Sequence, residues 1–146
     1  MPRTLMGRFL LASMLRHKSE SDRLSARFNN FGSLASAHVM IAAFEIAVGH
    51  LFEPEVDLEE ISIFVSDMRR GFGSDVPSLE TEALIRHMLG EDVVIGDLSV
   101  KTKTAAMIFT LMAWADLQQR DETKVTHLVC EAERRALARG HQPELA

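Results

Sequence analysis

Two stretches of the chain are apolar around nearly the whole circumference of a helix. Residues 33–52 read SLASAHVMIAAFEIAVGHLF, and residues 104–115 form a long uncharged run in the second half. Glu45 interrupts the first stretch, and a carboxylate in midspan costs about 3 kcal/mol in a bilayer, which disfavours a membrane crossing. A helix that is apolar all round in a water-soluble chain lies in the interior of a bundle. We therefore predict two central apolar helices and no transmembrane segment.

The segment after Asp57 carries the clearest amphipathic pattern. Asp57 is typical of an N-cap, and Glu59 and Glu60 follow where the helix dipole favours negative charge. Apolar side chains then recur every three or four residues, which predicts a helix that ends near Arg70. They are Leu58, Ile61, Phe64, Val65, Met68 and Phe72. Ile63 projects opposite this stripe, so it needs a second neighbour in this chain or another chain.

Capping residues delimit a further helix. Ser78, which follows Pro77, is a credible N-cap, and the apolar spacing continues to residue 89. Gly90 then stands where a left-handed C-cap belongs. Residues 91–98 carry apolar side chains without helical spacing, so we expect an irregular connector there.

The last part of the chain, residues 101–139, has helical spacing throughout, and no Gly or Pro divides it. Typical helix lengths favour a break near residues 120–122, although one continuous helix stays open. The hydrophobic pattern as a whole predicts an all-α, single-domain bundle of five to six helices around the two apolar ones.

The first 32 residues differ from the rest in charge. Residues 1–28 hold six Lys/Arg against two acids, whereas residues 29–146 hold ten against nineteen. The apolar run 9–15 is short for a signal sequence and is followed by basic residues, and the cations are spread around the helix. Gly32 and Ser33 offer a break before the first apolar helix. We therefore expect a basic N-terminal arm over 1–32, separable from a bundle domain over 33–146.

Composition narrows the class of protein. A chain of 146 residues is long enough for one self-sufficient core. Its single cysteine, Cys130, excludes an internal disulfide and favours a reducing, cytoplasmic location. The acidic body argues against nucleic-acid binding, which needs clustered Lys/Arg on one face.

Residues 82–92 read EALIRHMLGED, a packing and capping pattern. On this segment and the order of the helices around it, residues 42–139 resemble a group of short all-helical actinobacterial proteins of uncharacterised function. The resemblance implies the all-helical fold and no activity. It does not extend over residues 1–32.

Glu45 is the first candidate for a functional residue, because it lies on an otherwise apolar helix. His38 lies two turns earlier on the same face. A buried carboxylate must be hydrogen-bonded, paired or protonated, so Glu45 and His38 are candidates for ligand binding in a bundle pocket. The alternatives are a structural partner for a backbone donor or an arginine, or a wet stripe on the helix. We expect Glu45 to be mostly buried against the second apolar helix, with a partner within reach.

A weaker candidate is a metal site on the last helix. His127, Cys130 and Glu131 lie at positions i, i+3 and i+4, close enough to converge on one ion, but spacing nominates no ligand from another helix. Arg69 and Arg70 are suited to an anion, and equally to the negative end of a helix dipole. The sequence holds no motif with a mechanism attached, and we predict no cofactor.

Three classes of function remain. We rank first an interaction or regulatory module that acts as a homodimer, driven by the apolar first helix and by Ile63, with a further protein partner possible in principle. The second is a binding protein for a small apolar or amphipathic ligand in a cavity near Glu45. An enzyme ranks last, because no recognisable catalytic site is present in the sequence.

Overall fold

A computed structural model describes residues 1–28 and 34–146, and within them the chain is all-helical, with seven helices and no strand. The helices are α1 (Leu5–Met14), α2 (Lys18–Ser25), α3 (Leu34–Leu51), α4 (Leu58–Phe72), α5 (Ser78–Met88), α6 (Val100–Leu117) and α7 (Glu122–Ala138). The predicted number of helices, five to six, is slightly too low, because the N-terminal segment forms two helices. None of the described helices is both long enough and apolar enough to cross a membrane.

The helix ends follow local chemistry. Thr4, Ser99 and Asp121 each accept a hydrogen bond from a backbone N–H of the helix that follows, so they cap α1, α6 and α7. Gly90 has φ = 95°, the left-handed conformation expected after α5. The N-cap of α5 is Pro77, one residue earlier than predicted.

Residues 101–139 form two helices. Gln119 and Arg120 have φ values of 58° and 52°, a left-handed conformation in which a helix cannot continue. The left-handed backbone of these two residues therefore separates α6 from α7, although neither residue is Gly or Pro.

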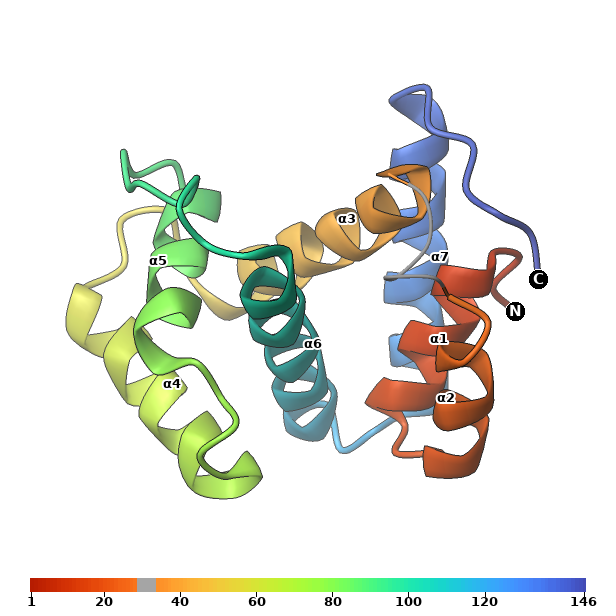
Figure 1. The fold of residues 1–146 in the computed structure, drawn as a ribbon. Coiled ribbons are helices and arrows are strands. Elements are labelled where there is room, and N and C mark those ends of the chain that lie inside the picture. Colours follow the sequence, from red (N-terminus) through yellow and green to blue (C-terminus); the bar gives the residue numbers. More distant parts are fainter. Residues whose placement is uncertain (29–33) are drawn as a thin grey trace.

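The helices form two flanks joined by α3 and α6 (Figure 1). The α4–α5 hairpin makes one flank, and α1, α2 and α7 make the other. α6 stands between the flanks, while α3 crosses behind it and packs against α1, α6 and α7. Each flank therefore meets the other mainly through these two helices.

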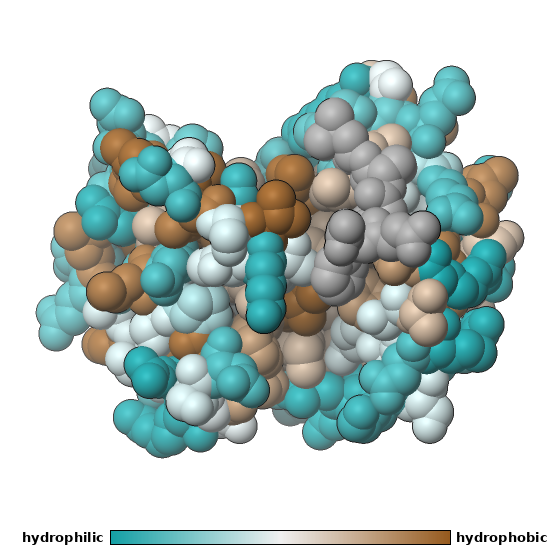
Figure 2. Space-filling view, viewed as in Figure 1, coloured by the Kyte–Doolittle hydropathy of each residue, from teal (hydrophilic) through white to brown (hydrophobic). Residues whose placement is uncertain are grey.

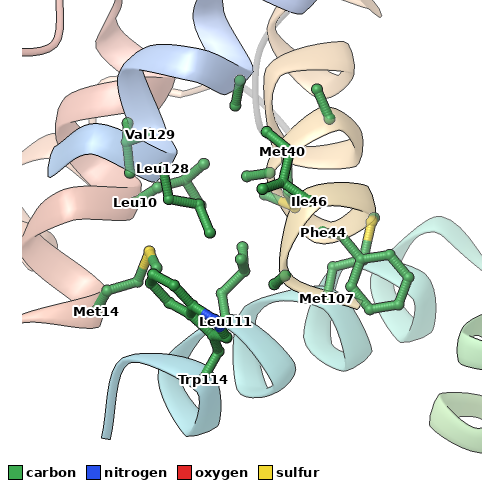
Figure 3. Packing of buried hydrophobic residues seen from close by; sticks show 14 of the residues in the cluster. Leu10, Met14, Met40, Phe44, Ile46, Met107, Leu111, Trp114, Leu128 and Val129 are labelled. Carbon is green, nitrogen blue, oxygen red and sulfur yellow. The ribbon is translucent and has the colours of Figure 1, made fainter. Parts of the chain in front are cut away.

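One hydrophobic cluster runs through α1, α3, α6 and α7, with contributions from α4 and α5 (Figure 3). Its fully buried large side chains include Leu10, Met14, Phe44, Leu111 and Leu128. Because these come from helices at both ends of the sequence, the first and last helices belong to the same core.

The expectation that residues 1–32 lie outside the core is wrong for α1. Leu5, Met6, Leu10 and Met14 are 0–1% exposed and lie within the common cluster. The cations do not prevent this burial, since Arg8 faces solvent and Arg16 stands beyond the end of the helix. α2 is peripheral and buries one residue, Leu24. The predicted break at residues 32–33 lies outside the described residues.

Candidate functional site

Glu45 lies where α3 meets α7. Its carboxylate accepts a hydrogen bond from Arg135 at 3.2 Å and others from Arg139, the shortest at 3.1 Å. The Glu45 side chain is 32% exposed. The expected partner within reach is therefore confirmed, but the carboxylate is only partly buried and faces α7 instead of the second apolar helix, α6.

Two imidazoles stack beside this ion pair. The rings of His38 on α3 and His141, just after α7, are 3.6 Å apart between centroids and tilted by 10°. Burial of His38 lowers its pKa, and the nearby His141 and Arg139 lower it further. Neutral His38 therefore closes the contact between the start of α3 and the end of α7.

These groups correspond to the arginine-partner alternative for Glu45. Both carboxylate oxygens accept from guanidinium groups, which occupies the acceptors a ligand would need. Four clefts of the described chain, three along α7 and one between α4 and α6, are lined by residues other than Glu45 and His38. Ligand binding by these two residues stays a prediction.

The suggested metal ligands do not converge. Within the described residues, no group of three His, Cys, Asp or Glu is placed to hold a metal ion. Glu131 accepts a hydrogen bond from Arg134 at 2.6 Å, and this contact lowers the pKa of Glu131. His127 and Cys130 instead line an open cleft of about 510 Å³. The spacing was right for one helix face, but a neighbouring arginine takes up the carboxylate.

The arginines near the end of α4 also have local partners. Arg70 pairs with Asp67 at 3.3 Å, and Arg69 donates to the Ser78 hydroxyl at 3.3 Å. Both contacts are exposed and join α4 to itself or to the start of α5. They match the structural role that the helix dipole suggests.

Glu133, which the sequence did not single out, joins α7 to the N-terminal segment of the chain. Its carboxylate on α7 accepts hydrogen bonds from the backbone N–H of Arg3 at 3.0 Å and of Thr4 at 2.6 Å, and from the Thr4 hydroxyl. Thr4 in turn caps α1 by accepting from the N–H of Gly7. The negative charge thus lies at the positive end of the α1 dipole.

Gly7 makes room for this contact. A Cβ atom built on Gly7 would collide with the Glu133 carboxylate, with the Cδ atom only 2.9 Å away. Next to it, the N–H of Leu5 donates to the carbonyl of Glu144, and the N–H of Ala146 donates to the carbonyl of Arg3. A glycine in an apolar helix is the one local signal of a close approach here, and it names no partner.

The outer face of α7 borders two adjoining clefts. The first, of about 510 Å³, is lined by α7, and the second, of about 720 Å³, lies between α7 and both chain ends. They share Cys130 and Arg134, so we treat them as one α7 groove. Its lining is Glu122, Thr123, Thr126, His127, Cys130, Glu133, Arg134 and Leu137 from α7, with Met1, Arg3, Thr4, Gln142, Pro143 and Leu145.

Comparisons of the chain with protein-family models, with curated proteins and with solved structures found no match. The resemblance of residues 42–139 to short all-helical actinobacterial proteins therefore stays a prediction.

Proposed function

We propose that this protein is a small helical interaction or regulatory module that acts as a homodimer. The observation that carries the proposal is the α7 groove, whose rim holds three exposed apolar side chains. Met1, Leu137 and Leu145 are 81%, 63% and 69% exposed. Single exposed apolar residues are ordinary, whereas several gathered around one groove are typical of an interaction surface.

The surface elsewhere supports this location for the contact. On the visible face of the α4–α5 flank, hydrophobic residues are dispersed among polar ones (Figure 2). Ile63 lies opposite the apolar stripe of α4 and is 53% exposed, and it has no groove beside it among those described. α1 cannot supply the contact that we expected from it, because its apolar residues are in the core.

The second candidate is a binding protein for a small apolar or amphipathic ligand near Glu45. It finds less support, because Arg135 and Arg139 already engage that carboxylate. An enzyme ranks below both, because the sequence holds no motif with a catalytic mechanism attached.

Sedimentation velocity of the full chain over a range of micromolar concentrations tests the proposal. We expect a reversible shift from monomer to dimer as concentration rises. A sedimentation coefficient that stays at the monomer value throughout this range contradicts the homodimer.

A further inference from the structure

α7 carries two faces with helical spacing. One is buried against α3 and α1, and its members are Val125, Leu128, Val129, Ala132 and Ala136. The opposite face contains Thr123, His127, Cys130, Arg134 and Leu137, none of which is buried. These five residues are separated by four, three, four and three positions, the spacing of the contact seam in paired helices. We call them the α7 seam.

We propose that the α7 groove is covered by the α7 groove of a second copy, with the two α7 helices antiparallel about a two-fold axis near Cys130. This inference rests on the proposed homodimer and names its surface. Cys130 is the middle residue of α7, which runs from Glu122 to Ala138. A two-fold axis there brings the whole seam of each copy against the seam of the other.

The charges at the two ends of the groove favour a second copy whose α7 helix runs antiparallel to the first. Glu122 lies at the N-terminal end of α7, and Arg3 lies beside its C-terminal half, where its backbone N–H reaches the Glu133 carboxylate. Both side chains are exposed, and neither has an ion-pair partner in the described part of the chain. An antiparallel pair sets the Glu122 end of each α7 against the half of the other α7 beside which Arg3 of the partner subunit lies, and this happens twice. A parallel pair brings like charges together.

The size of the side chains also suits a helix pair. Cys130 at the axis is small, as are Thr123 and Thr126, whereas His127 and Arg134 are large, so the two helix axes can approach most closely near Cys130. Leu137 at the end of the seam, with Met1 and Leu145 beside it, adds apolar area that a lone helix pair would lack. The antiparallel arrangement covers these three side chains in both copies.

Cross-linking through the single cysteine tests the position of the axis. We would treat the full chain with a short bis-maleimide at a concentration where the dimer predominates. Because Cys130 is the one cysteine, a product of twice the mass joins two Cys130 residues. The matched control moves the thiol to the exposed outer side of α4, in the double variant C130S/S66C. We expect a covalent dimer from the native chain and little from the control.

A charge exchange tests the direction of the helices. Arg3→Glu and Glu122→Lys should each raise the dissociation constant of the dimer roughly fivefold, the effect of losing two exposed ion pairs. The variant with both changes should return it close to the native value. Leu137→Glu should raise it more than tenfold, since two charges enter the contact. Leu79→Glu on α5, where Leu79 is 77% exposed, is the matched control and should leave it unchanged.

The outcomes separate the inference from the function. A native dimer that Leu137→Glu leaves intact and Ile63→Glu dissociates overturns the α7 surface and keeps the homodimer. A dimer that the double charge variant leaves as weak as the single variants overturns the antiparallel arrangement. A native chain that stays monomeric overturns the inference together with the proposed function.

Discussion

The two flanks of the molecule are held by different kinds of contact. On the flank of α1 and α7, polar contacts join residues about 90 to 130 positions apart, as in Glu133 with Arg3 and Glu45 with Arg135. On the α4–α5 flank, the described polar contacts are local, such as Arg70 with Asp67 and Arg86 with Glu91. That hairpin reaches the rest of the chain through apolar and aromatic contacts, including Phe72 with Phe109 on α6.

The difference shows two ways of placing a helix. An amphipathic helix such as α4 needs one apolar stripe, and burial of that stripe orients it without specific polar partners. A helix that is apolar on several sides has no such preference. The orientation of α1 and α3 is instead set by their polar contacts to α7. Each of these hydrogen bonds has good geometry in only one arrangement of the helices.

The largest expected effect follows removal of α1 together with the short helix α2. A chain that begins at Asn30 loses the side chains of Leu5, Leu10 and Met14 from the common core. Exposure of the facing apolar surface costs several times the roughly 1.5–3 kcal/mol of one such side chain, which is comparable to the whole stability of a domain. We expect thermal melting, followed by circular dichroism, to lose its cooperativity.

A cooperative transition near the native melting temperature in the shortened chain would contradict the core role of α1. It would restore the interpretation of residues 1–32 as an accessory arm. The control is the full-length chain with the substitution Leu79→Ala. The Leu79 side chain is 77% exposed, so its loss should change the free energy of unfolding by under about 0.5 kcal/mol.

The same Gly→Ala substitution should have opposite signs on the two flanks. In Gly7→Ala the new Cβ pushes the Glu133 carboxylate away from Thr4, so we expect a loss of about 1–3 kcal/mol in the free energy of unfolding. Gly71 lies within α4 with no atom near the added Cβ. Gly71→Ala should therefore gain up to about 1 kcal/mol from helix propensity.

Urea denaturation of both variants measures the two values. Glu133→Gln keeps an acceptor and loses the charge, so it should lie between the native chain and Gly7→Ala. Equal effects of Gly7→Ala and Gly71→Ala would show that Glu133 does not hold the N-terminal segment in solution.

Removal of an ion pair should have a small effect that differs between flanks. Glu45→Gln weakens the contacts to Arg135 and Arg139, and because the Glu45 side chain is partly exposed we expect a loss of about 1 kcal/mol or less. Asp67→Asn on α4 removes the ion pair with Arg70, which lies within one helix and is more exposed than the Glu45 contacts. It should lower the free energy of unfolding by about half as much or less. Thermal melting at low and high salt measures both.

Because salt screens exposed charges, the loss from Glu45→Gln should shrink as ionic strength rises. A loss of several kcal/mol that salt does not change would instead point to a deeply buried carboxylate. The original expectation of a mostly buried Glu45 would then hold in solution.

The smallest expected effect is a dependence of stability on pH. The pKa of His38 is lowered below its usual value near 6.5, so the folded chain binds fewer protons there than the unfolded chain. The contribution of neutral His38 is present above about pH 6.5 and is lost as the pH falls through the lower, folded-state pKa. The groups that face the ring are His141, Arg139 and, on the same side of α3, Glu45.

Denaturation midpoints at pH 7 and pH 5 measure this dependence. His38→Gln should flatten it, whereas His87→Gln, an exposed imidazole on α5, should leave it as in the native chain. Identical pH profiles for the native chain and His38→Gln would contradict the stacked, neutral imidazole.

The sequence predicted some elements of this molecule well and others poorly, for reasons that particular residues show. The stripe from Leu58 to Phe72 predicted α4 and the position of Ile63 opposite its buried side, because one-sided burial is a local property of spacing. The sequence predicted that Glu45 needs a hydrogen-bonding partner, but it did not predict that Arg135 and Arg139 are the partners. Nothing near Glu133 in sequence indicates that its carboxylate holds Arg3 and Thr4.

The amino-acid sequence by itself determined that the chain is helical, where most helices begin and end, and which side chains avoid water. These properties depend on residues within a few positions of one another, through hydrogen bonds along the backbone and the period of the helix. The tertiary structure decided that α1 joins the core and that Glu45 meets α7. Such pairings depend on how apolar surfaces fill space together, so groups about 90 to 130 residues apart meet only after packing has chosen one arrangement.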